Sequence, residues 1–289
     1  PQLAQLAQWI SPSAQGLAGT ALLAAETPRQ IANVHTFFNI ANAALFVGFT
    51  TQIARLVEWL IPDRPLKPRK AMLPKYLDED LLDNPSIALE AVRSELKRMG
   101  KRVRKMVTDI MPTAISGTRE DLDRIAEMDK VVDSLHHAII EYLGQISLAT
   151  LSKRQSKELL QLVEIANALE QIGDRIATGM VTSANKRIDE NVIVSAETAQ
   201  ALNEYHALVV TALRDALRAV STQNSTLAKQ VRQSKKEFTL RSRDLIEHGL
   251  DRLTADEPNR LNTYAREMEI MELLDIVFAI ARRIARTQG

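Results

Sequence analysis

Charged and apolar positions divide the chain into two parts with different patterns. Residues 31–54 form a run of 24 residues that contains no Asp, Glu, Lys or Arg. A membrane-spanning helix needs about 20 mostly apolar residues, so this run is long enough to cross a bilayer. Its Asn, His and Gln side chains disfavour a lone helix surrounded by lipid and favour a helix packed against other membrane segments. A buried helix of a soluble protein is the alternative.

The flanks of this run also favour a membrane segment. Trp59 lies at its C-terminal edge, where aromatic side chains gather at membrane interfaces. The linker that follows, residues 62–79, is rich in proline and carries the basic residues Arg64, Lys67, Arg69, Lys70 and Lys75. This charge predicts that the C-terminal side of an inner or cell membrane span is cytoplasmic, and it could also contact membrane lipid headgroups.

The N-terminal residues 1–25 carry no charged side chain. They could form a preceding span or an irregular segment embedded in the membrane, and the pattern does not decide between the two. Because the chain starts within this pattern and without methionine, we interpret it as a fragment whose residues 1–61 are the C-terminal end of a membrane domain.

The remaining residues, 80–289, read as an all-α domain. Proline is absent between Pro112 and Pro258, and strong helix formers fill the interval. Sparse turn signals, such as Ser116-Gly117, divide the segment into about six long helices. We expect these helices near residues 86–114, 120–150, 154–186, 191–222, 226–253 and 257–287. The two sets of three have matching lengths and apolar rhythm, which predicts a tandem of two three-helix bundles.

Two pairs of carboxylates interrupt the apolar faces of this domain. Asp129 and Asp133 lie on the second expected helix, and Glu170 and Asp174 lie on the third. Residues four apart share a helix face, so the two carboxylates of each pair could bind one cation together. Four acids brought together favour a divalent or trivalent cation with hard oxygen ligands.

Other interpretations of these acids stay open at this stage. They could instead form ion pairs with neighbouring basic side chains such as Arg175 or Lys130. His136 could join them as a ligand, although a solvated position fits its spacing better. A ferritin-like di-iron centre is disfavoured, because the chain contains no Glu-x-x-His motif.

Composition removes several classes of function. The chain has no cysteine, and its 37 basic and 36 acidic residues nearly cancel. With an aromatic content of 4%, it offers neither bulk charge nor stacking surfaces for nucleic acid. Phosphate-binding glycine motifs, hydrolase motifs and zinc-protease motifs are all absent from the sequence, so we expect no enzyme.

The acidic helices resemble a known family. The segment ANALEQIGDRIATG, which contains Glu170 and Asp174, is similar to a characteristic helix of PhoU domains, and Asp129-x-x-x-Asp133 looks like its partner motif. The opening LEAVRSELKRMGKRVRKMV resembles the first helix of that family. The resemblance implies a six-helix tandem that regulates phosphate homeostasis and binds a metal such as iron, zinc, manganese or magnesium. Since Met271 stands where a second Glu170 would be, we expect at most one occupied cluster.

The apolar part resembles a second family. The segment RQIANVHTFFN, with Arg29, His35 and Asn39, is similar to the last membrane segment of sodium/phosphate cotransporters, whose bacterial members often carry a PhoU-like domain next. The joint resemblance implies a parent protein that takes up inorganic phosphate with sodium under control of the PhoU-like domain, which could form a homodimer. The alternative is a membrane-tethered helical signalling or scaffold protein without transport activity.

Overall fold

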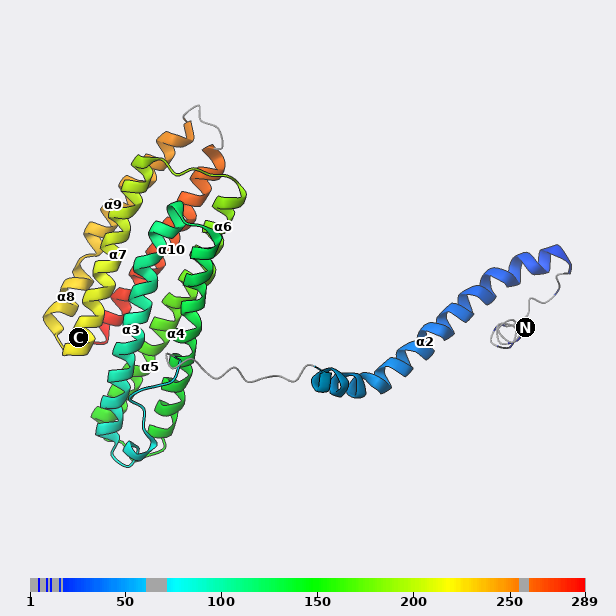
Figure 1. Cartoon of the computed structure of the whole chain (residues 1–289), viewed down its shortest axis with the longest axis horizontal. Helices are drawn as coiled ribbons and strands as arrows, with labels where there is room; N and C mark the ends of the chain where they lie inside the picture. Colours follow the sequence, from blue (N-terminus) through cyan, green and yellow to red (C-terminus); the bar gives the residue numbers. More distant parts are fainter. Residues whose placement is uncertain are drawn as a thin grey trace. The chain divides into compact units, whose positions relative to one another are not determined.

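The computed structural model describes residues 18–60, 72–254 and 260–288, together with Gln5, Trp9, Ser11 and Gly16. The chain divides into two compact units, Pro1–Lys67 and Pro68–Gly289, each of which is described by itself (Figure 1). The expected basic linker falls largely outside the described residues, as does the side chain of Trp59. All regular elements in the described ranges are helical, which confirms the expected all-α fold.

The N-terminal unit contains one long helix, α2 (Thr20–Leu60), which has 41 residues and includes Pro28. At 1.5 Å per residue it is about 60 Å long, roughly twice the hydrocarbon thickness of a bilayer. Its window Thr20–Ile53 is the one described segment that passes for a membrane span by length and composition, and none of that window is buried. Large apolar side chains such as Ile31, Phe38 and Phe46 are exposed along it. Within its own unit, this helix is therefore not buried.

The C-terminal unit is a bundle of long helices. Its elements are η1 (Glu79–Leu81), α3 (Pro85–Ser116), α4 (Arg119–Ile146), α5 (Lys153–Asp174), the π-helical turn η2 (Arg175–Met180), α6 (Val181–Asp189), α7 (Ala196–Thr222), α8 (Ser225–Gln233), α9 (Lys235–Thr254) and α10 (Arg260–Arg286). The six long helices that the sequence predicts, called rods below, are present. The third rod is interrupted by η2, and the fifth is divided between α8 and α9. The first rod ends at Ser116, as the Ser116-Gly117 turn signal predicted.

The rods form two groups of three that share one hydrophobic core. In the first group α3, α4 and α5 pack on one another, and in the second α10 packs on α7, α8 and α9. Contacts of α3 with α7 and of α10 with α5 and α6 join the groups (Figure 1). A single cluster of buried apolar side chains runs through both groups, from Leu89 on α3 to Ile284 on α10.

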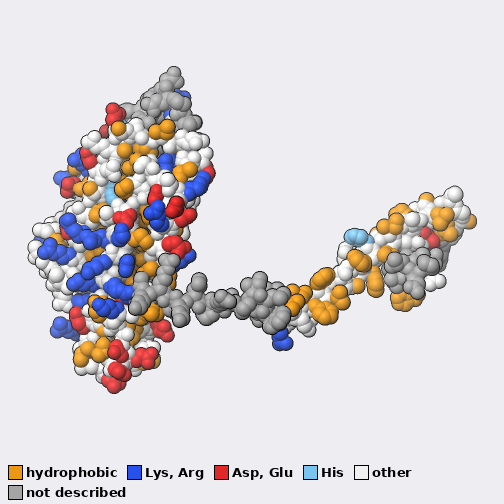
Figure 2. Space-filling model, in the orientation of Figure 1, with side chains coloured by type: hydrophobic (Ala, Val, Ile, Leu, Met, Phe, Trp, Pro, Cys, Tyr) orange, Lys and Arg blue, Asp and Glu red, His pale blue; other side chains and the backbone are white. Residues whose placement is uncertain are grey.

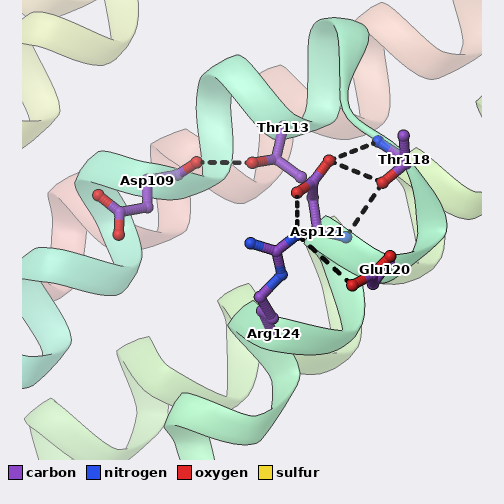
Figure 3. Close-up of polar contacts among 6 residues, drawn as sticks. All are labelled: Asp109, Thr113, Thr118, Glu120, Asp121 and Arg124. Carbon is purple, nitrogen blue, oxygen red and sulfur yellow. Dashed lines mark hydrogen bonds and ion pairs between the residues drawn. The ribbon is translucent and has the colours of Figure 1, made fainter.

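A capping box sets where α4 begins. Thr118 donates from its backbone N–H and its hydroxyl to Asp121 Oδ2, at 3.0 and 2.7 Å, and Asp121 N–H donates back to Thr118 Oγ1 (Figure 3). These hydrogen bonds favour the charged carboxylate and lower the pKa of Asp121. Arg124 pairs with the same carboxylate at 2.9 Å. The start of α4, at Arg119, is thereby fixed nearly three turns before Asp129.

Candidate functional site

The first two acids of the candidate site lie on α4 and the other two lie at the end of α5. Asp129 and Glu170 are partly buried, whereas Asp133 and Asp174 are exposed. The helices meet closely at Gly173, where an added Cβ would lie 2.5 Å from Asp129 Oδ1 and 3.3 Å from Val132 Cγ1. The carboxylate of Asp129 therefore occupies the space that any larger residue at position 173 would need.

Electrostatic interactions link Asp129 to the other three acids, and we refer to the four residues as the acid cluster. Burial and, to a smaller extent, the charges of Asp133, Asp174 and Glu170 together raise the pKa of Asp129 to about 7. Burial and the charge of Asp174 also raise the pKa of Asp133, against a smaller opposing effect of His136. Near neutral pH the cluster thus holds a carboxyl group that is poised between its protonated and charged forms.

Ion pairs do not compensate this cluster. None of the four acids lies within 4.0 Å of a basic side chain in the described ranges. Lys130, one of the expected partners, pairs with Glu127 instead. Asp129 Oδ1 is buried and has no hydrogen-bond partner, which is costly for a carboxylate oxygen. The orphaned oxygen leaves a proton or a cation as the means of compensation.

The donor set fits a metal in chemistry but not in its present placement. Carboxylate oxygens are the ligands that Mg²⁺, Mn²⁺ and Fe ions accept. As the side chains stand, no group of three or more His, Cys, Asp or Glu residues in the described ranges is arranged to hold a metal ion. Binding a metal would therefore require the mutually repelling carboxylates to change rotamer. The metal and its ligands accordingly stay a prediction.

A π-helical turn next to the cluster was not foreseen from the sequence. The turn η2 begins directly after Asp174, and such turns are frequent at functional sites. The Thr178 hydroxyl donates to the Asp174 carbonyl oxygen at 2.6 Å and lies 3.3 Å from Asp174 Oδ1. Within the turn, a Cβ on Gly179 would lie 2.6 Å from Leu273 Cδ2, so η2 fits closely against α10.

The histidine at the site, His136, contacts a side chain of the neighbouring helix α5. His136 is partly buried and its Nε2 lies 2.9 Å from Asn167 Oδ1, to which it donates. The sequence favoured a solvated position for this residue, but a contact between α4 and α5 holds it. Its remaining nitrogen, Nδ1, is the atom that could face a ligand.

The corresponding position in the second group of helices is filled differently. Met271 is 8% exposed and belongs to the hydrophobic core. Asp275 accepts a hydrogen bond from the Tyr205 hydroxyl. Burial raises the pKa of Asp275, the bond from Tyr205 lowers it, and the charge of Glu272 raises it. No counterpart of the four-acid cluster forms among the residues described there.

The three residues of the expected transport-domain motif lie on α2. Asn39 Nδ2 and His35 Nδ1 are 3.1 Å apart, a contact in which the amide donates. Arg29 precedes His35 by six residues, about 240° around the helix, so it lies on a different face. The structure joins His35 to Asn39 and leaves Arg29 separate from them.

A buried carboxylate on α3 holds the chain where it enters the bundle. Glu95 is fully buried, and its Oε2 accepts hydrogen bonds from the backbone N–H groups of Lys75 and Tyr76 at 2.7 and 2.8 Å. Arg98 pairs with Glu95 and donates to the Leu73 carbonyl oxygen at 2.9 Å. Sequence reasoning missed this contact, because a Glu followed three residues later by an Arg is common on a solvated helix face.

Comparisons with known proteins agree with the architecture. Residues 96–178 match the PhoU domain family, a segment that contains all four acids. The crystal structure of PhoU from Pseudomonas aeruginosa matches 70% of this chain and 96% of its own, with a TM-score of 0.65 and 20% identity. The phosphate transport system regulatory protein PhoU from Streptococcus pneumoniae matches 71% and 95%, with a TM-score of 0.62 and 15% identity. The bundle therefore has a PhoU-like fold.

The curated relatives extend the similarity beyond the bundle. YjbB of Salmonella typhimurium, named as a candidate inorganic phosphate export protein, is 24% identical over 237 residues, and its Escherichia coli K12 counterpart is 22% identical. The match covers 82% of this chain, which spans 43% of the length of these relatives. Because 237 residues exceed the 222 of the second unit, the similarity reaches into the apolar unit.

Proposed function

We propose that this chain is the C-terminal part of a membrane protein that moves inorganic phosphate, and that its PhoU-like bundle regulates this movement. The observation that carries the proposal is the order of parts within one chain. A helix with the length and composition of a membrane span precedes a PhoU-like bundle, and the similarity to relatives named for phosphate export covers the bundle and reaches into the first unit.

Two observations disagree about the direction of phosphate movement, and only one of them concerns the coupling ion. Resemblance to cotransporters suggested uptake with sodium, whereas the names of the relatives favour export. We therefore place inorganic phosphate in the proposal as substrate and test direction and sodium separately. Cells that express the full-length parent would be loaded with labelled phosphate, and efflux and uptake would be measured with and without a sodium gradient.

Regulation requires the bundle to bias two states of the membrane part. A bundle can do this only if it interacts differently with each state. The backbone contacts of Glu95 are a physical connection through which a change in α3 would reach the chain that leads to α2. We propose that metal occupancy of the acid cluster is one input to this connection.

Deleting residues 80–289 from the parent tests the regulatory part. We expect phosphate movement to persist but to lose its response to cellular phosphate. A finer test is Glu95→Gln, which keeps the side-chain length but removes the charge that pairs with Arg98. Its matched control is Glu90→Gln, an exposed acid on the same helix. Unchanged rate and unchanged response in both the deletion and Glu95→Gln would contradict the proposal.

Metal analysis of the purified chain tests whether the acid cluster binds a metal. We expect a stoichiometric amount of metal at no more than this one cluster, and we expect the metal to be lost when Asp129→Ala and Glu170→Ala are combined. The control combines Asp244→Ala with Glu247→Ala, two exposed acids on α9. A chain that carries no metal and tolerates the first pair of changes would instead support a helical scaffold with a solvated acidic face.

A further inference from the structure

A cationic groove lies on the bundle between α3 and α7. It has a volume of about 170 Å³, and six basic residues but no acidic residue line it. Lys97, Lys101 and Arg104 come from α3, and Arg214 and Arg218 come from α7. Figure 2 shows Lys and Arg side chains gathered on the face that carries these two helices.

The spacing of these residues makes the groove electrostatically strained without a partner. Lys97, Lys101 and Arg104 are four and three residues apart, so they lie along one stripe of α3, and Arg214 and Arg218 are four apart on α7. Like charges at these spacings destabilise a helix. Among these side chains only Arg214 pairs with a described acid, the adjacent Asp215 at 2.8 Å.

Close packing beneath the cations holds the two rows at a set separation. A Cβ on Gly100 of α3 would lie 2.9 Å from Leu217 Cδ2 of α7, so the helices meet at the floor of the groove. Leu96, Ile165 and Val220 complete an apolar floor. Charges above an apolar floor interact more strongly with a bound anion than charges surrounded by water.

We propose that this groove binds a phosphate-bearing anion. Phosphoryl oxygens match the forked donors of Arg and the point charge of Lys, and an anion with several charges can bridge the rows on α3 and α7. No aromatic side chain lines the groove, so it lacks the stacking surface that single-stranded nucleic acid uses. Such an anion could be a dissolved phosphoryl compound or the headgroup of an anionic phospholipid.

The groove continues into a second hollow. This hollow, about 360 Å³, shares Arg93, Ile165 and Val220 with the groove and adds Arg154 and Lys157. Glu158 pairs with Arg93 there, so this end is less cationic. The gradient of charge places the phosphoryl group in the α3/α7 groove and leaves the hollow for the less charged part of the ligand.

A fluorescent label separates the two sources of the anion. The chain contains no cysteine, so Ser221→Cys places a unique label on the groove lining. In the first arm, the full chain in non-ionic detergent is titrated with inorganic phosphate, pyrophosphate and tripolyphosphate. In the second arm, the labelled chain is compared in lipid discs of phosphatidylcholine alone and of phosphatidylcholine with phosphatidylglycerol in equal parts.

We expect saturable tripolyphosphate binding that is weakened about tenfold or more by Lys101→Gln, Arg104→Gln and Arg218→Gln combined, since charge-assisted hydrogen bonds are lost. The charge-matched control combines Lys229→Gln, Lys235→Gln and Lys236→Gln, which are exposed and lie outside the groove. A response in the detergent arm assigns a dissolved ligand, and a response confined to phosphatidylglycerol discs assigns a headgroup. Absence of both responses, or equal weakening by the two triple variants, would overturn the proposal. None of these readouts depends on phosphate transport or on a metal in the acid cluster.

Discussion

The two three-helix groups share one architecture but surround one partly buried carboxylate each, Asp129 in the first and Asp275 in the second, in opposite ways. In the first group Asp129 lies among three other acids, its buried Oδ1 has no partner, and burial with like charges raises its pKa to about 7. In the second group Asp275 is joined by the hydroxyl of Tyr205, whose ring stacks on Phe238. The first arrangement is incomplete without a proton or a cation, whereas the second is satisfied by the protein itself.

The difference indicates which of the two groups to test for a bound ligand. Asp129 lacks the hydrogen-bond donor that Asp275 has, so we expect a compensating ligand, if one binds, in the first group. The PhoU domain match, residues 96–178, falls on the first group. Exchanging residues between the two groups tests whether this difference is real.

The largest expected effect comes from placing a carboxylate in the second group. Met271→Glu would put a charge at a core position that is 8% exposed, and we expect a loss of about 3 kcal/mol in the free energy of unfolding. The reverse change, Glu170→Met, removes repulsion in the first group and should leave the metal-free chain as stable or more stable. Denaturant unfolding of the full chain in detergent measures both. Equal losses in the two variants would show that the groups do not differ.

Gly173→Ala should disturb the first group at the contact between α4 and α5. The added methyl would lie 2.5 Å from Asp129 Oδ1, so we expect a loss of about 2 kcal/mol, which outweighs the roughly 1 kcal/mol that alanine gains in a helix. Gly144→Ala is the control, because nothing lies within 4 Å of a Cβ there. It should stabilise the chain by up to about 1 kcal/mol. A stable Gly173→Ala variant would mean that Asp129 moves away without cost.

Tyr205→Phe tests whether the second group depends on its internal donor. The change removes this hydrogen bond from the partly buried carboxylate of Asp275, and we expect a loss of between about 1 and 2 kcal/mol in the free energy of unfolding. The pKa of Asp275 should rise, because the bond from Tyr205 lowers it. Combining the change with Asp275→Asn in a double-mutant cycle isolates the pair. Strict additivity of the two changes would rule out the interaction.

The smallest effect is a pH dependence that belongs to the first group. The pKa of Asp129 rises from 3.8 to about 7 on folding, so its contribution to stability is present below about pH 4 and is lost as the pH rises towards 7. In chelator, the wild-type chain should lose of the order of 1 kcal/mol relative to Asp129→Asn over this interval. Thermal unfolding at a series of pH values measures the difference. Parallel curves for the two chains would contradict the shift.

Local patterns predicted much of this molecule. The apolar run, the six rods and the break at Ser116-Gly117 follow from periodicity and turn chemistry, which act over a few residues. The placement of Asp129 and Asp133 near Glu170 and Asp174 was also within reach, because short connections make neighbouring helices antiparallel. Whether the acids hold a metal stays a prediction, since the side-chain arrangement depends on what is bound.

Other features depend on residues that are far apart in the sequence. Glu95 reads as a solvated helix residue, and only the return of residues 73–76 over α3 buries it. Tyr205 and Asp275 are 70 residues apart, and no local pattern links them. The cationic groove likewise needs both α3 and α7. In the sequence, the basic residues of either helix alone read as an ordinary solvated face.

By itself, the amino-acid sequence determined where helices form, which segment suits a membrane and which carboxylates interrupt an apolar face. Those properties depend on residues within a turn or two of one another. Tertiary structure alone decided which charges are compensated: Asp275 receives a donor, Glu95 receives two backbone N–H groups, and Asp129 receives neither. The physical reason is that the cost of a charge depends on its distance from water and from partners, and that distance is set by packing of the whole bundle.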